Sequence, residues 1–118
     1  MTVTFYWYPK CGTCQKAKKW MDESNVQYNA IHIVDETPSK DQLKEMVDRS
    51  KLPIKKFFNT SGQKYRELNV KDKLKTMSEE EMLELLASDG MLIKRPIVTD
   101  GTKVTVGFKE ATFEETWK

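Results

Sequence analysis

Cysteine and histidine are scarce in this chain of 118 residues, which contains two cysteines and one histidine, His32. A structural zinc site usually takes four cysteine or histidine ligands. The three available side chains cannot complete one, so we expect no bound metal, and the sequence predicts no other bound cofactor. His32 lies in a run typical of a β-strand, and we interpret it as structural or exposed rather than catalytic.

An excess of charge of one sign is also lacking. The chain has 20 Lys and Arg residues against 18 Asp and Glu residues, which gives a formal net charge of +2. Such a small excess, mixed along the chain, does not favour direct binding to nucleic acid or to an anionic membrane. Nothing in the sequence demands a second copy, so we expect a monomer.

Long apolar runs are absent as well. No stretch of the sequence approaches the roughly 18 apolar residues that a membrane-spanning helix needs. The first residues, MTVTFYWYPKC, lack the basic start and long apolar segment of a signal peptide. We therefore expect a cytoplasmic protein, and in that compartment thiols are kept reduced, which argues against a structural disulfide.

The first third of the chain predicts a βαβ unit. The β-branched and aromatic run at residues 3–7 predicts a buried strand, and residues 26–34 predict a second one. Residues 12–23 predict a helix between them, because apolar side chains recur on one face at Cys14, Ala17, Trp20 and Met21. In a βαβ unit the two strands should be parallel.

The middle of the chain is expected to be helical. Capping boxes formed by Ser39 with Gln42, and by Ser78 with Glu81, predict the starts of two helices. Gly90 stands where the second of these helices would end in a C-cap glycine.

The last part of the chain returns to strands. The tight-turn signal Asp100-Gly101 predicts an antiparallel hairpin of Ile97–Thr99 with Val104–Val106, followed by a closing helix. We therefore expect an α/β fold in which helices pack on a four-stranded mixed sheet. Residues 1–118 would form a single domain with a helical insertion at about 36–90.

Both cysteines lie in YPKCGTCQKAKKW, at residues 8–20. Cys11 would stand just before the first helical turn, where unpaired N–H groups and the helix dipole favour a thiolate, with Lys10 and Lys16 adding positive potential. Cys14, one turn further, could attack a mixed disulfide formed at Cys11. This spacing predicts Cys11 as nucleophile and Cys14 as resolving thiol. The alternative is two apolar cysteines without a role.

Pro96 begins the predicted strand that would face the cysteines. In a thioredoxin-like fold a cis-proline opens that strand, and proline is the residue for which a cis bond costs least. Arg95, just before it, could then point toward the thiolate. The alternative, which the pattern leaves equally open, is that Lys94 and Arg95 only end a surface loop.

Four motifs together resemble the arsenate reductase ArsC / Spx / YffB family: CGTC, FFNTSGQKYRELN, LLASDGMLIKRPI and VGFKEATFEETW. The resemblance spans nearly the whole chain, and IKRPI followed by VGF is its most specific part. It implies a thioredoxin-like (glutaredoxin-like) fold with a helical insertion. It also implies that Cys11 is the active-site cysteine, that Arg95 lines the site and that Pro96 is the cis-proline.

The resemblance also indicates which substrate to doubt. Arsenate reductases of this family hold their oxyanion with three arginines, and only Arg95 is matched here. Phe58 and Asn59 stand at the place of the first arginine, and VGF at 106–108 replaces the pattern of the third. One arginine offers few charge-assisted bonds, so we do not expect arsenate reduction.

Two functions therefore follow from the resemblance. The first is a thiol–disulfide oxidoreductase of glutaredoxin type that acts on a small-molecule or protein disulfide, with glutathione or another thiol as co-substrate. The second is an Spx-like redox-sensing regulator that binds the α subunit of RNA polymerase. Spx-type chains usually carry a glycine near that contact, and Ser50, Lys51 and Leu52 provide none. We therefore place the enzyme first.

Overall fold

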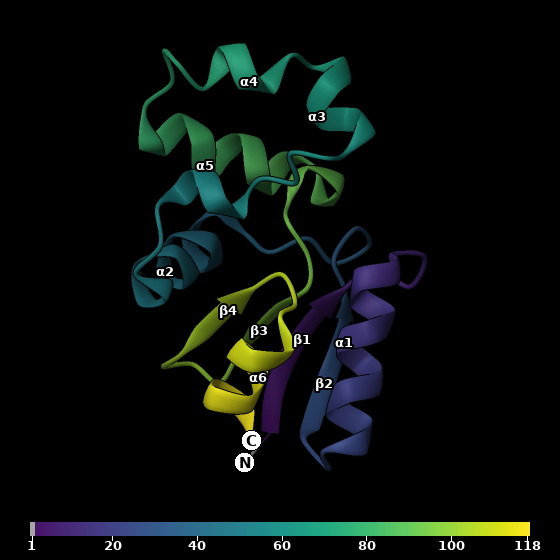
Figure 1. Ribbon diagram of the computed structural model, residues 1–118. Helices are drawn as coiled ribbons and strands as arrows, with labels where there is room; N and C mark the ends of the chain where they lie inside the picture. Colours follow the sequence, from purple (N-terminus) through teal and green to yellow (C-terminus); the bar gives the residue numbers. More distant parts are fainter. Residues whose placement is uncertain (1) are drawn as a thin grey trace. The chain divides into compact units, whose positions relative to one another are not determined.

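The computed structural model describes residues 2–118, which form two compact units. The first unit combines residues 2–32 with Arg95–Lys118, and the second consists of Ile33–Lys94. Figure 1 shows that the first contains the strands and the second is built from helices. A single domain with an insertion at about 36–90 stays a prediction.

The first unit holds a mixed sheet that has four strands within residues 2–118, in the order β2-β1-β3-β4. The strands are β1 (Thr2–Trp7), β2 (Gln27–His32), β3 (Ile97–Thr99) and β4 (Val104–Val106). β1 pairs with β2 in parallel and with β3 in antiparallel fashion, and β4 runs antiparallel to β3. The predicted mixed sheet and its parallel βαβ pair are confirmed.

Strand β2 is shorter than the expected strand at 26–34. The N–H of Val26 donates to the carbonyl of Met21 at 2.9 Å, so this group is not available to the strand ladder. At the other end, His32 pairs with Trp7, which is the last residue of β1. The ladder stops there because β1 offers no further partner.

Helices α1 (Gly12–Glu23) and α6 (Glu110–Trp117) cover one face of this sheet (Figure 1). The predicted apolar face of α1 is buried, as expected from its spacing. The core between helices and sheet consists of Val3, Phe5, Ala17, Trp20, Met21, Val98, Phe113 and Trp117. The indole N–H of Trp117 donates to the hydroxyl of Thr105 at 3.0 Å, which satisfies the polar groups buried in this layer.

The β3–β4 hairpin forms as its turn residues predicted. The carboxylate of Asp100 accepts the N–H groups of Thr102 and Lys103 at 2.8 and 2.7 Å. Gly101 has a φ of 93°, in the left-handed region that glycine enters without steric cost. These contacts fix the short strands that carry the last part of the chain into α6.

The second unit contains helices of four to eleven residues and two 3₁₀ segments, Ile54–Phe57 and Gly90–Leu92. The helices are α2 (Lys40–Ser50), α3 (Gln63–Glu67), α4 (Val70–Lys73) and α5 (Glu79–Ser88). Both predicted capping boxes are present, at the starts of α2 and α5. Lys40 forms ion pairs with Glu80 and Glu84, which link α2 to α5.

The expected role of Gly90 as a helix C-cap is wrong. Helix α5 ends at Ser88, the cap position is Asp89 in an extended conformation, and Gly90 begins a 3₁₀ segment. A Cβ atom on Gly90 would lie 2.2 Å from the carbonyl oxygen of Ile33. Glycine is required here because another backbone segment approaches closely, which a local pattern cannot reveal.

We expect Gly90→Ala to lower the free energy of unfolding by more than the roughly 1 kcal/mol that is typical of point substitutions. The methyl group would meet backbone atoms, which cannot move aside as a flexible side chain can. Urea unfolding followed by circular dichroism measures the effect. Gly12→Ala is the matched control, because its Cβ would find no described atom within 4 Å. Equal unfolding midpoints for the two variants would contradict this packing.

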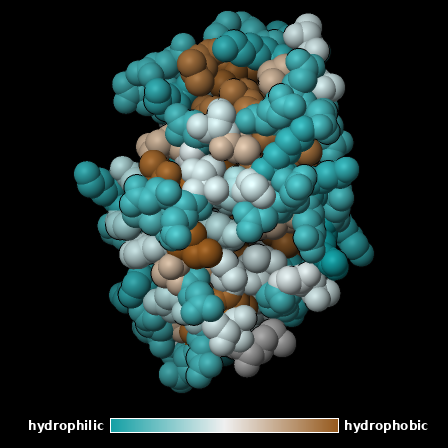
Figure 2. Space-filling model, turned by 180° about the vertical axis from the view of Figure 1, so that it is seen from behind, coloured by the Kyte–Doolittle hydropathy of each residue, from teal (hydrophilic) through white to brown (hydrophobic). Residues whose placement is uncertain are grey.

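Hydrophilic side chains cover most of the face that Figure 2 shows, interrupted by separate apolar patches. Leu52 and Leu68 are large apolar side chains on the surface, exposed by 40% and 36%. In the part of the chain that the structure describes, no helix has both the length and the apolar character to cross a membrane.

Candidate active site

The loop between β1 and α1 places Cys11 at the N-cap of α1, with φ −88° and ψ 121°. Its N–H donates to the carbonyl of Tyr8 at 2.9 Å, and its carbonyl accepts the N–H of Gln15 at 3.0 Å. The Cys11 side chain is half-buried and its thiol is free. This is the predicted strand-to-helix position, where the first N–H groups of the helix favour negative charge.

Cys14 lies one turn further along α1 and is completely buried. Its thiol is also free, and its sulfur accepts a hydrogen bond from the N–H of Tyr8 at 3.5 Å. The two thiols therefore differ in solvent contact, since Cys11 can be reached from outside and Cys14 cannot. This difference matches the predicted division into an attacking and a resolving thiol.

The surroundings of Cys11 lower the pKa of its thiol below the ordinary value. Burial acts to raise this pKa. It is outweighed by hydrogen bonds from the backbone N–H and the thiol of Cys14, by the positive charge of Arg95 and by the N–H of Thr13. Since the thiolate is the reactive form of cysteine, these contacts favour a nucleophile at Cys11.

The pKa of Cys14 moves in the opposite direction, to about 12. Burial is the main cause, and the hydrogen bond with Cys11 and the negative charge on Cys11 also raise it. The hydrogen bond from the N–H of Tyr8 is the largest effect in the opposite direction, and the charge of Arg95 adds a smaller one. Cys14 is therefore the thiol of the pair that keeps its proton, and Cys11 is the one that ionises more readily.

Pro96 and Arg95 stand beside the end of β1. Ile97 pairs with Tyr6, so Pro96, one residue earlier, lies next to the point where the cysteine loop leaves the strand. The Arg95-Pro96 peptide bond is cis, which confirms the expected cis-proline, and the carbonyl of Pro96 accepts the N–H of Gly107 at 2.8 Å. The charge of Arg95 reaches both cysteines, which supports the site interpretation over the surface-loop alternative.

Sequence reasoning missed Tyr8, which contacts both cysteines and Arg95. Its main chain bonds to Cys11 and Cys14, and its ring lies 5.0 Å from the guanidinium carbon of Arg95. His32 packs edge-on against the same ring, with ring centres 5.5 Å apart. The only signal in the sequence was its position between the predicted strand at residues 3–7 and Cys11.

Between Thr2 and Lys118, no three His, Cys, Asp or Glu side chains come together in a group that could hold a metal ion. The catalytic roles of Cys11, Cys14, Arg95 and Pro96 stay predictions, although the structure brings these residues to one end of the sheet.

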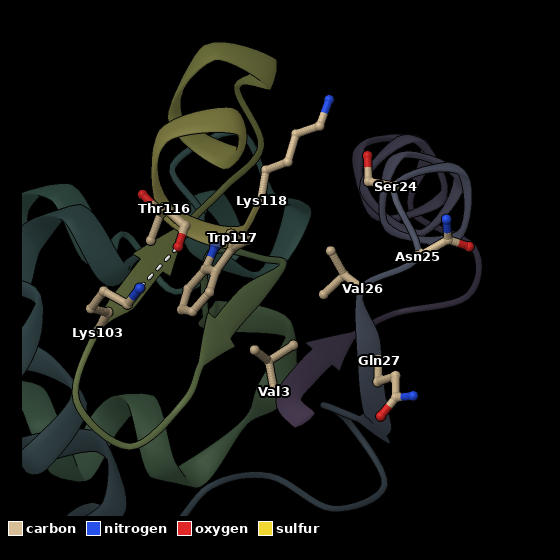
Figure 3. Close-up of a pocket in the computed structure, with 9 residues that line it drawn as sticks. All are labelled: Val3, Ser24, Asn25, Val26, Gln27, Lys103, Thr116, Trp117 and Lys118. Atoms are coloured by element: carbon tan, nitrogen blue, oxygen red, sulfur yellow. Dashed lines mark hydrogen bonds between the residues drawn. The ribbon is translucent and has the colours of Figure 1, made fainter. Parts of the chain in front are cut away.

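A hollow of about 470 Å³ lies at the opposite end of β1 and β2, between the ends of α1 and α6 (Figure 3). Lys103 closes one side, where its ammonium group donates to the carbonyl of Thr116 at 3.0 Å. Val3, Val26 and Trp117 supply its apolar part. The predicted site residues are absent from its described lining, so we assign no thiol chemistry to this hollow.

We expect Arg95→Gln to raise the pKa of Cys11, because the substitution removes the positive charge that stabilises the thiolate. The rate of Cys11 alkylation, measured against pH, should move toward higher pH and fall severalfold at neutral pH. Arg49→Gln on α2 is the control, since Arg49 is exposed and pairs with nearby Glu45 in an i,i+4 contact of 3.3 Å. An unchanged profile for Arg95→Gln would show that its charge does not act on Cys11.

Comparison with known proteins identifies similar chains along nearly the full length. YusI of Bacillus subtilis, described as an uncharacterized protein, is 68% identical and covers 99% of this chain and 99% of its own. Regulatory protein MgsR of Bacillus subtilis is 33% identical over 90% of this chain and 82% of its own. Global transcriptional regulator Spx of Listeria innocua is 30% identical over 92% of this chain and 81% of its own.

Solved structures show the same architecture. The crystal structure of an ArsC family related protein from Bacteroides fragilis superposes with a TM-score of 0.94 and is 50% identical. The match covers 98% of this chain and 97% of the other. The predicted thioredoxin-like α/β fold is thereby confirmed. The ArsC family profile matches residues 6–116, a span that includes both cysteines and the cis-proline. The chain therefore belongs to the ArsC family.

Proposed function

We propose that the protein is a cytoplasmic thiol–disulfide oxidoreductase of glutaredoxin type, with Cys11 as nucleophile and Cys14 as resolving thiol. The observation that carries this proposal is the opposite displacement of two pKa values in thiols one helical turn apart. Groups whose surroundings separate their pKa values in this way commonly divide the roles of a reaction between them.

In the first step, the Cys11 thiolate attacks one sulfur of a substrate disulfide. A bond forms between Cys11 and that sulfur, the substrate S–S bond breaks, and the second substrate sulfur leaves as a thiolate that takes a proton from water. Arg95 stabilises the attacking thiolate and can pair with a carboxylate of the substrate. The backbone around Pro96 contacts the substrate chain beside the end of β1.

In the second step, Cys14 attacks the sulfur of Cys11. An internal Cys11–Cys14 disulfide forms, and the remaining substrate sulfur leaves as a thiol, so two electrons have passed from the pair to the substrate. Mixed-disulfide formation removes the negative charge on Cys11, which is one cause of the raised pKa of Cys14. The first step thus prepares Cys14 for the second.

The cycle closes when two molecules of glutathione, or another thiol, reduce the internal disulfide. Each supplies one electron and one proton, and they leave as an oxidised disulfide. The co-substrate is therefore consumed and not retained. The proposed catalytic cycle therefore uses the two cysteines of the protein and a thiol from outside it.

A trapping experiment tests this proposal. Cys14→Ser should accumulate one glutathione on Cys11 when incubated with oxidised glutathione, because the resolving thiol is missing. Wild-type protein should instead release glutathione and form the internal disulfide, which intact-mass spectrometry distinguishes. If neither protein reacts with oxidised glutathione, cystine or a model protein disulfide, the proposal is wrong.

The regulator relatives favour a second candidate function. MgsR and Spx carry regulatory names, and each aligns with at least 90% of this chain. Oxidation of the cysteine pair could alter the first turn of α1 and change a docking surface for the α subunit of RNA polymerase. A pull-down with that subunit, in oxidised and reduced buffers, separates the candidates, and absence of binding in both states removes this one. Arsenate reduction, assayed with a thiol donor, is expected to be negligible.

A further inference from the structure

The backbone of Tyr8 holds both cysteines in place. Tyr8 follows directly after β1, and its carbonyl accepts the N–H of Cys11 at 2.9 Å. Its own N–H donates to the sulfur of Cys14 at 3.5 Å. These main-chain contacts do not depend on the identity of the side chain, so a substitution at Tyr8 can change the ring while it leaves the loop intact.

The ring of Tyr8 contacts two side chains of the same unit. The guanidinium carbon of Arg95 lies 5.0 Å from the ring centre, within the roughly 6 Å range of a cation–π interaction. The imidazole of His32 meets the same ring edge-on, with an angle of 89° between the planes. All three side chains are half-buried, so the ring has limited freedom and presents a fixed surface to Arg95.

The place of the guanidinium matters because its effect on Cys11 falls with distance. An arginine side chain is long and flexible, and an unsupported one can turn toward water. Contact with the Tyr8 ring opposes that motion. We propose that Tyr8 is a positioning residue, whose ring holds the guanidinium of Arg95 beside the Cys11 thiolate. The inference rests on the proposed role of Cys11 as nucleophile.

The test compares the pH profile of Cys11 alkylation in three proteins. Tyr8→Leu removes the ring and should move the profile toward higher pH, in the direction expected for Arg95→Gln. Tyr8→Phe keeps the ring and loses only the hydroxyl, so its profile should match that of the wild type. A purely structural role for Tyr8 would not produce this contrast. If Tyr8→Leu does not fold, Tyr8→Met provides the same comparison, and circular dichroism shows which variants are folded.

A double-substitution cycle tests whether Tyr8 acts through Arg95. In the Arg95→Gln background, Tyr8→Leu should cause no further change in the profile, because the charge that the ring positions is gone. An unchanged profile for Tyr8→Leu alone, or an equal shift in Tyr8→Phe, overturns the inference. If the wild type still forms the glutathione adduct on Cys11 in that case, only the role of Tyr8 has failed. If no adduct forms, the proposed function has failed.

Discussion

Cys11→Ser should abolish disulfide reduction, with kcat/KM lower by about a thousandfold or more, as expected for loss of a covalent nucleophile. A serine hydroxyl remains protonated near neutral pH and cannot form a disulfide. The rest of the site would persist, because the main-chain bonds of Cys11 to Tyr8 and Gln15 do not use the side chain. The measurement is the rate of cystine reduction, followed as the oxidised glutathione that forms while reduced glutathione completes the cycle.

Cys14→Ser provides the matched control for that experiment. Its Cys11 can still attack, so it should form the mixed disulfide and retain slow turnover when a second glutathione replaces the resolving thiol. Both variants change one sulfur to oxygen, which removes size as an explanation of any difference. Equal activity of Cys11→Ser and wild type would refute the assignment, and so would loss of adduct formation in Cys14→Ser with retention in Cys11→Ser.

Phe113→Ala should lower the free energy of unfolding by about 3 to 5 kcal/mol, the usual range for removing a buried aromatic side chain. Phe113 has no exposed surface and meets two rings edge-on, Trp20 at 5.3 Å and Phe108 at 4.7 Å. It thereby joins α6 to α1 over the sheet. A loss of this size is a large part of the roughly 5 to 15 kcal/mol that stabilises an ordinary domain.

Urea unfolding measures this effect, and Glu115→Ala is the control on the same helix. Glu115 is exposed, so its substitution should change the free energy of unfolding by about 0.5 kcal/mol or less. The free energy of unfolding of Phe113→Leu should lie between those of Phe113→Ala and Glu115→Ala, because leucine keeps an apolar side chain in the core. If Phe113→Ala and Glu115→Ala unfold at the same urea concentration, the core described between α1, α6 and the sheet is wrong.

The parts of the fold that sequence reasoning predicted well are those with a strong local signal. Helix α1 begins and ends where its apolar spacing indicated, because four buried side chains repeat on one face. The starts of α2 and α5 follow from their capping boxes. In each case a few neighbouring residues determine the backbone, and distant contacts only reinforce it.

Other elements depend on contacts that a local pattern does not contain. Helices α3 and α4 have five and four residues, too few for an apolar repeat to be recognised. The need for glycine at position 90 comes from the carbonyl of Ile33, which is far away in the sequence. Such close approaches exist only after the chain has folded.

The residues of the candidate site also separate into those with a local sequence signal and those that only the folded chain brings together. Cys11 and Cys14 stand out by spacing, and the Arg95-Pro96 pair by the motif that contains it. The charge that acts on Cys11 is that of Arg95, brought close by the pairing of β3 with β1. Lys10 and Lys16 were expected to contribute from their sequence positions, and both side chains are exposed. The importance of Tyr8 emerges only from the same strand register and from the position of the Arg95 side chain.

The pKa of Cys11, taken from its alkylation rate against pH in the Cys14→Ser variant and in wild type, tests the central claim most directly. We predict a value for the wild type well below about 8.5, the reference for a free cysteine, so the rate should already be high at neutral pH. In Cys14→Ser only one thiol gives a signal. The pKa of Cys11 in this variant should stay below the reference value, because Arg95 and the helix N–H groups still favour the thiolate. A wild-type value at or above 8.5 would contradict the assignment of Cys11 as an activated nucleophile.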